Sequence, residues 1–158
     1  MRFGGRQALS VAQQMLHLRN SAIYPGEGTL TAGSLTWRFK RRPTGLSREY
    51  ELRLAISEGG VPRIYVDRPD LVLLAEGDRL PHVYKQRPTH LCLYLPSARE
   101  WQPWDRLDQT VLPWADIWLL YFEDWLAGGR NEWRGGGEHP DSDTVASRER
   151  RRLRRAMG

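Results

Sequence analysis

Two stretches in which apolar and polar residues alternate constrain the fold of this chain most. The alternation runs over residues 35–40 and again over residues 50–56. A period of two residues is that of a β-strand with one buried face. Glu58-Gly59-Gly60 then offers a hairpin turn into a third strand over residues 63–67. The sequence therefore predicts an antiparallel β-meander that needs a partner layer for its apolar face.

Helical periodicity lies on both sides of this meander. Residues 6–19 carry apolar side chains on one helical face, and residues 114–127 carry aromatic side chains at three- and four-residue steps. Pro113 suits the first turn of the second helix, and Gly128-Gly129 suits its end. Aromatic residues at this spacing usually pack in a core. The predicted fold class is α+β, a meander flanked by helices.

Length and composition indicate one globular domain. The chain has 158 residues, of which 40% are hydrophobic, enough to bury a core. No apolar run approaches the roughly 18 residues of a membrane span. The first residues lack the apolar segment of a secretory signal, so we expect a cytoplasmic protein with no membrane association. The single cysteine, Cys92, excludes an internal disulfide.

The net charge of +5 is concentrated at the C-terminus. Residues 148–155 contain six arginines and one glutamate, and the rest of the chain is close to neutral. We therefore expect a domain over residues 1–140 and a basic, disordered tail over residues 141–158. A small nucleic-acid-binding protein that uses this tail is the least favoured function. The body lacks a basic face interleaved with aromatic residues, and nucleic acid is not an expected partner.

Residues 80–103 form an irregular segment with four prolines, in which only 91–95 reads as extended. The segment contains His82, Tyr84, His90 and Cys92. Residues two apart in an extended stretch share a face, so His90 can stand beside Cys92 and favour its thiolate. Functional side chains often lie on such loops when a rigid scaffold holds them.

Three other interpretations of these residues are weaker. A zinc site built on Cys92 and the histidines would need His139 as a further ligand, so no metal is expected. A protease-like Cys–His pair fits the composition, but no protease signature surrounds the cysteine. The glycines at 135–137 lack the frame of a phosphate loop and are interpreted as a flexible connector.

The order of these features resembles the ubiquitin-conjugating (UBC) fold. That family has a helix, a meander, a His-Pro-Asn motif, a catalytic Cys-Leu and a following Trp-Ser-Pro. Here His82 precedes Cys92 by ten residues, Leu93 follows it, and Trp101-Gln102-Pro103 comes next. Val83-Tyr84 stands in place of Pro-Asn.

A narrower resemblance covers residues 80–139. The chain is similar there to short UBC-like proteins of cyclic-oligonucleotide-based antiphage signalling systems (CBASS). The motifs that carry it are Pro81-His82-x-Tyr84, Leu91-Cys92-Leu93-Tyr94-x-Pro96, Glu100-Trp101, Thr110-x-x-Pro113-Trp114, Trp118-Leu119 and Trp133-x-Gly135-Gly136-Gly137-x-His139.

The resemblance implies acyl transfer by a ubiquitin-conjugating-like enzyme. Cys92 would carry the C-terminal glycyl group of a cGAS-like cyclic-oligonucleotide synthase (CD-NTase) as a thioester and pass it to a target, priming antiphage signalling. The resembled systems include either a separate activating enzyme, which would be a second partner, or only this short protein, and no cofactor is implied. Tyr84 or His90 would supply the hydrogen bond that the family's asparagine gives the oxyanion, or Tyr84 would only pack the loop, and His82 would be structural. We therefore expect Cys92 to be at least partly exposed. The alternative is a non-catalytic UBC-like adaptor.

Overall fold

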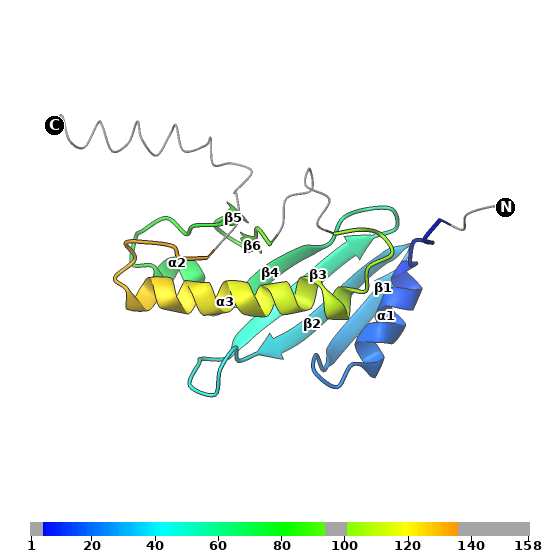
Figure 1. The fold of residues 1–158 in the computed structure, drawn as a ribbon, viewed down its shortest axis with the longest axis horizontal. Coiled ribbons are helices and arrows are strands. Elements are labelled where there is room, and N and C mark those ends of the chain that lie inside the picture. Colours follow the sequence, from blue (N-terminus) through cyan, green and yellow to red (C-terminus); the bar gives the residue numbers. More distant parts are fainter. Residues whose placement is uncertain (1–4, 94–100, 136–158) are drawn as a thin grey trace, which may run out of the picture.

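The computed structural model describes residues 5–93 and 101–135 (Figure 1). It confirms the α+β class: a six-stranded antiparallel sheet follows an N-terminal helix and precedes a long helix. The elements in chain order are α1 (Val11–Asn20), β1 (Gly26–Thr31), β2 (Ser34–Arg41), β3 (Tyr50–Ser57), β4 (Arg63–Arg68), α2 (Leu71–Leu74), β5 (Val83–Lys85), β6 (Thr89–Leu91), η2 (Leu107–Gln109) and α3 (Val111–Ala127). The tail predicted at residues 141–158 lies outside the described residues.

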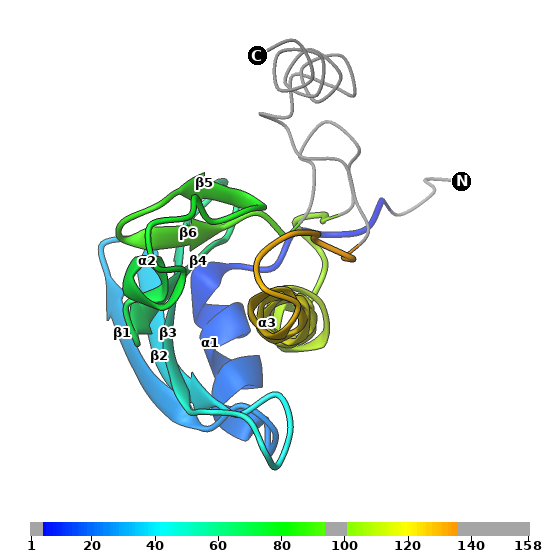
Figure 2. The ribbon, with the colours of Figure 1, turned by 90° about the vertical axis from the view of Figure 1, so that its left-hand side faces the viewer.

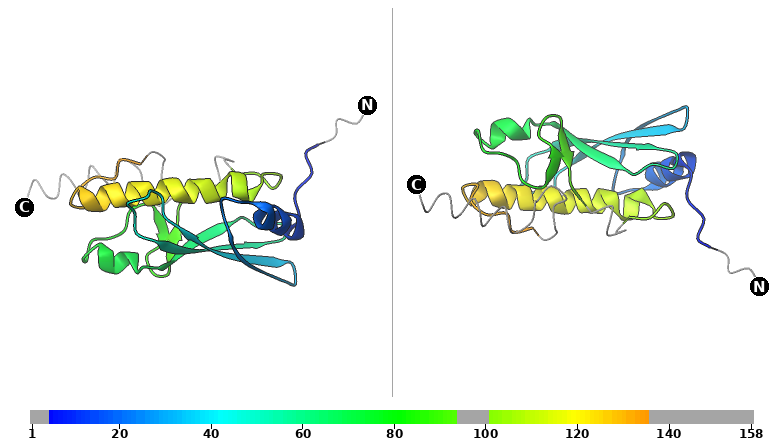
Figure 3. Two further views of the ribbon diagram at one scale, coloured as in Figure 1. Left: turned by 90° about the horizontal axis from the view of Figure 1, so that it is seen from below. Right: turned by 90° about the horizontal axis from the view of Figure 1, so that it is seen from above.

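The strands lie in the order β1-β2-β3-β4-β6-β5, and each neighbouring pair is antiparallel. Helices α1 and α3 cover the same face of the sheet, as Figure 2 shows. Figure 3 shows α3 running along that face with α1 at one end of it. The alternation predicted in β2 and β3 is confirmed, because the apolar positions of both strands are buried and the intervening ones are not.

The aromatic helix is core on one side, as its spacing predicts. Trp118, Phe122 and Trp125 are at most 5% exposed, and the indole of Trp118 stacks on the ring of Phe122 with centroids 5.4 Å apart. α3 begins at Val111, so Pro113 does lie in its first turn, and Gly128 is its C-cap. Within the described residues α3 is the only α-helix after the sheet, whereas the UBC resemblance implies C-terminal helices in the plural.

Helix α1 begins five residues after the predicted start at residue 6. Ser10 is its N-cap and forms a capping box with Gln13, which is why the preceding residues are not helical. Gln14 is 1% exposed and ties α1 to the segment before α3. Its amide donates to the carbonyl of Asp105 at 2.8 Å and accepts from the Leu107 N–H at 3.0 Å.

The sequence pattern predicts no strand before residue 35, whereas β1 begins at Gly26. Glycines and exposed polar residues fill this edge strand, so it shows no alternation. Its hairpin with β2 turns through Ala32 and Gly33, both at positive φ. Hairpin turns of two residues are usually recognised in a sequence by Asn-Gly or Asp-Gly. Alanine stands at the first position of this turn, so the pattern is absent from the sequence.

The segment predicted as irregular also contains sheet. β5 and β6 both pair in it, and β6 covers residues 89–91 rather than 91–95. Strands of three residues are too short to show a period. β6 pairs with β4 and β5 pairs with β6, which brings the segment that contains His82 and Cys92 to the edge of the sheet opposite β1.

Candidate active site

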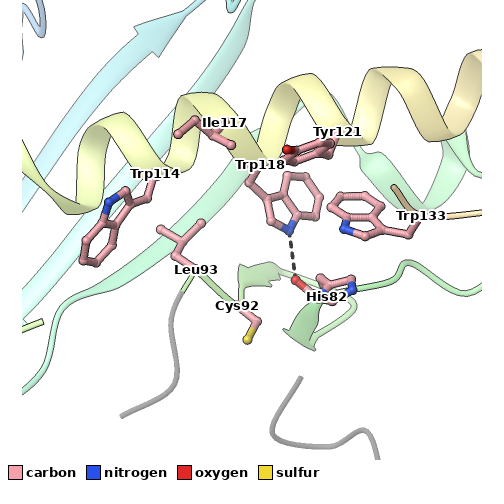
Figure 4. Close-up of a pocket in the computed structure, with 8 residues that line it drawn as sticks. All are labelled: His82, Cys92, Leu93, Trp114, Ile117, Trp118, Tyr121 and Trp133. Carbon is pink, nitrogen blue, oxygen red and sulfur yellow. Dashed lines mark hydrogen bonds between the residues drawn. The ribbon is translucent and has the colours of Figure 1, made fainter. Parts of the chain in front are cut away.

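A small pocket lies between α3 and the segment that follows β6. Its volume is about 140 Å³. Figure 4 shows its lining: His82, Cys92, Leu93, Trp114, Ile117, Trp118, Tyr121 and Trp133. Two of the four residues predicted for the site, His82 and Cys92, thus meet at one pocket. Cys92 comes directly after Leu91, the last residue of β6.

The backbone carbonyl of His82 holds this arrangement together. It accepts a hydrogen bond from the Cys92 N–H at 3.1 Å and another from the indole Nε1–H of Trp118 at 2.9 Å (Figure 4). A carbonyl oxygen has two lone pairs, so both donors are accommodated. The same atom therefore fixes the cysteine backbone relative to α3.

His82 adopts a left-handed backbone conformation, with φ at +50°. Histidine, asparagine and aspartate are the non-glycine residues that enter this region most readily. The imidazole stacks on the indole of Trp133, with ring centroids 5.2 Å apart and planes 27° apart. These contacts give His82 a structural role that does not require proton transfer.

Sequence reasoning did not single out Trp133 as a site residue. Its indole also packs against Trp118 at 5.3 Å and Tyr121 at 6.2 Å between centroids. Gly135 lies so close that a Cβ there would clash with the Trp133 indole nitrogen and the Tyr121 ring. Gly135 is therefore a close-packing residue, not a flexible connector. The sequence feature that could have indicated this contact is the spacing of Trp133 and Gly135, two residues apart.

An ion pair outside the pocket joins α3, which carries part of the pocket lining, to the sheet. The guanidinium of Arg41, on β2, binds Asp116 of α3 through two hydrogen bonds of 2.7 and 2.8 Å. The hydroxyl of Tyr24 donates to the same carboxylate at 3.0 Å, and burial raises the pKa of Tyr24 above its usual range, helped by Asp116. Asp116 does not line the pocket, and this network ties α3 to β2 from a different side of the helix.

The thiol is less exposed than expected. Cys92 is 8% exposed, which corrects the expectation of a partly accessible side chain. The cause is its backbone position: Cys92 continues β6 and is bound to His82 rather than lying on an open loop. Figure 4 shows its Sγ pointing away from the rings of α3, whereas the side chain of Leu93 points toward Trp114 and Ile117.

The other two predicted site residues belong to a separate ring cluster. The imidazole of His90 lies between Tyr65, at 4.8 Å, and Tyr84, at 4.9 Å between centroids. Tyr65 pairs with His90 across β4 and β6, and the guanidinium of Arg53 covers the Tyr65 ring at 4.2 Å. Neither Tyr84 nor His90 is among the described residues that line the pocket.

Burial lowers the pKa of His90 from its usual 6.5, and the positive charge of Arg63 lowers it further. The imidazole is therefore neutral at pH 7. A neutral histidine does not stabilise a thiolate by charge. In this state His90 therefore does not give Cys92 the electrostatic support that was expected.

Among residues 5–93 and 101–135, no three His, Cys, Asp or Glu side chains gather closely enough to hold a metal ion. His139, which the zinc alternative required, lies outside these residues. In the same part of the chain, no helix combines the length and the apolar character needed to cross a membrane.

Comparison with known proteins places these features in a family. The family model described as Type II CBASS E2 protein matches residues 14–140. A comparison with curated proteins finds no match. The matched range contains all six strands, α3, Cys92 and every residue that lines the pocket. The chain therefore belongs to the type II CBASS E2 family, UBC-like proteins with an E2-like role in antiphage defence alongside CBASS components such as the CD-NTase.

Proposed function

We propose that Cys92 is the nucleophile of an E2-like acyl transfer. It accepts the C-terminal glycyl group of the CD-NTase as a thioester and passes it to a target, which primes antiphage signalling. The observation that carries the proposal is that the chain's only cysteine lies beside a pocket, with its backbone held by His82. Family membership and the order His82, Cys92-Leu93, Trp101-Gln102-Pro103 support it.

The transfer has two steps. The Cys92 sulfur attacks the glycyl carbonyl of a thioester on an activating enzyme, the new C–S bond forms, and that enzyme's thiol leaves with the proton from Cys92. An amine of the target then attacks the same carbonyl, an amide forms, and the Cys92 thiol is released with a proton from the amine. Thiolates serve both steps because they are good nucleophiles and good leaving groups.

The supporting residues take different roles in this proposal. His82 is a positioning residue, acting through its carbonyl and its contact with Trp133. Oxyanion donation by the Tyr84 hydroxyl or by His90 rests on the family resemblance alone, because their ring contacts lie in the Tyr65 cluster. We also propose that the conjugating domain covers residues 1–140, with residues 141–158 as a basic tail, and that the protein acts in the cytoplasm.

The low exposure of Cys92 favours one competing function, a non-catalytic adaptor in which the thiol is incidental. The two functions differ in an adduct assay. We expect the full chain, incubated with the CD-NTase, plus an activating enzyme if the system has one, to form an adduct that a thiol reductant cleaves. Cys92→Ala should abolish it, and the fold should survive the exchange of one small side chain for another.

The matched variant is Cys92→Ser, which retains an attacking atom. An oxygen ester is less labile than a thioester, so an adduct of this variant should survive the reductant. Lys40 and Lys85 are the only side-chain amines in the chain, and replacing both with arginine removes lysine self-modification as a source of stable adduct. An adduct that persists unchanged in Cys92→Ala would refute the mechanism and favour the adaptor.

A further inference from the structure

The wall of the Cys92 pocket contains apolar side chains that the protein leaves partly open to solvent. Ile117 is 49% exposed, and Trp114, Tyr121, Trp133 and Leu93 are half-buried. Their neighbour Trp118 is only 4% exposed and forms the base of the same group of rings. The packing of α3 against the sheet does not need Ile117, since the buried face of the helix lies elsewhere.

The pocket has the size and chemistry of a receptor for one apolar side chain. A cavity of about 150 Å³ lined by aliphatic and aromatic groups holds a benzene molecule, and this pocket measures about 140 Å³. Its lining contains no Asp, Glu, Lys or Arg. A charged lysine of an acceptor would lose its hydration there without a counter-charge, whereas a leucine or phenylalanine side chain would gain by burial.

Cys92 itself lines the pocket, which limits what can enter it during the reaction. An acyl chain bonded to Sγ must pass along the adjacent surface, and an extended chain advances about 3.3–3.6 Å per residue. Sγ points away from the rings of α3 (Figure 4), so the chain must turn back along this surface to meet them. The one or two residues before the acylated glycine, which span about 3–7 Å, are the part of the chain that can contact the pocket.

We infer that this pocket selects the donor: it binds an apolar side chain on one of the two residues that precede the C-terminal glycine. The inference rests on the proposed function of Cys92 and specifies its substrate as a chain end of the type apolar-apolar-glycine. Ile117, Trp114 and Tyr121 are the specificity-determining residues. Arg41 and Asp116 hold the helix in place for them.

Short peptide thioesters test this without an activating enzyme. Transfer to Cys92 forms one C–S bond and breaks another, and the small thiol leaves with the proton of Cys92. The probes are acetyl-Leu-Leu-Gly and acetyl-Asn-Asn-Gly thioesters, with acylation of the full chain followed by intact mass. At subsaturating donor concentration we expect the Leu-Leu-Gly donor to react about 10–100-fold faster, the value of burying one leucine side chain.

Two substitutions on the same helix locate the preference. Ile117→Glu places a charge in the pocket wall and should remove most of the preference for the apolar donor. Leu120→Glu is the matched control: Leu120 is 41% exposed, one turn further along α3, and does not line the pocket. It should retain the preference. Both positions are exposed, and the comparison of the two donors on the unsubstituted chain does not depend on either variant.

The acylation assay separates the donor pocket from the nucleophile. Equal rates for the two donors, with acylation still confined to Cys92, would overturn the donor pocket and leave the nucleophile intact. No acylation of Cys92 by either donor would overturn the nucleophile itself. A preference that survives Ile117→Glu, or is lost equally in Leu120→Glu, would refute the assignment to this pocket. If Ile117→Glu alters only discharge to a lysine acceptor, the pocket serves the acceptor and the inference is wrong.

Discussion

The structural role assigned to His82 leads to a prediction that separates its backbone from its imidazole. At φ of +50°, an ordinary residue is strained by about 1–2 kcal/mol, whereas asparagine tolerates the conformation. His82→Asn therefore loses the stacking on Trp133, about 0.5–1.5 kcal/mol, without adding backbone strain. His82→Val loses the same contact and adds the backbone strain, because a β-branched side chain fits this conformation poorly.

The two variants should thus differ in stability by about 1–2 kcal/mol, or about 2–8 °C in melting temperature for a chain of this size. Thermal unfolding followed by circular dichroism measures the difference. Rates of Cys92 acylation by the Leu-Leu-Gly thioester supply the second readout. We expect His82→Asn to lose less than about tenfold, since it retains the carbonyl that binds the Cys92 N–H.

Trp118→Phe tests the same carbonyl from the other side. It removes the indole donor to His82, worth about 0.5–1.5 kcal/mol, while a ring remains to pack on Phe122. The His82→Asn variant gives the contradicting outcome. If its rate of Cys92 acylation falls by about 10²–10⁴-fold while its stability is unchanged, His82 acts in another way. That range is typical of a missing general base, and it would refute the positioning role.

Two further predictions concern stability. The pKa of His90 is lowered in the fold, so below pH 6.5 the unfolded chain binds more protons, and the free energy of unfolding should fall as pH falls toward the folded pKa. His90→Gln should flatten this part of the melting-temperature profile; an unchanged slope would contradict the shift. Gln14→Leu leaves the Leu107 N–H and the Asp105 carbonyl without their buried partner, which should cost about 2–4 kcal/mol in chemical denaturation. The control Gln13→Leu, at an exposed capping position, should cost less, and equal losses would argue against the buried bridge.

Sequence patterns predicted the elements that are long and half-buried. β2 and β3 alternate over eight residues each, and α3 repeats its aromatic side chains over 17 residues, so the period is readable. β1 was not predicted because it is an edge strand of mostly exposed residues. β5 and β6 were not predicted because three residues cannot show a period. Local spacing carries no information about such pairings, which depend on contacts made elsewhere in the sheet.

The part of the candidate site that contains the cysteine was predictable, because the chain has only one cysteine. A single cysteine in UBC order identified Cys92 and its neighbour His82. The pairing of His90 with Cys92 rested on two residues sharing one face of an extended segment, but shared faces do not decide which rings pack together. Tyr65, a partner from β4, takes one side of the imidazole, and Tyr84 takes the other. Trp133 was missed because it reaches the pocket only through the chain reversal after α3.

The burial of Cys92 and its proposed chemistry are compatible if binding of the donor, rather than free solvent access, brings the acyl group to the sulfur. A thioester on a widely exposed cysteine would meet water and unrelated amines. Because Cys92 is only 8% exposed, a donor chain end that fills the neighbouring pocket reaches the sulfur more readily than water or unrelated amines reach the thioester. The carbonyl of His82 then matters because a small, rigid site tolerates little displacement of Cys92. The same few contacts would thereby govern both the choice of donor and the protection of the intermediate, which is why the donor pocket and the His82 positioning should be tested on one acylation assay.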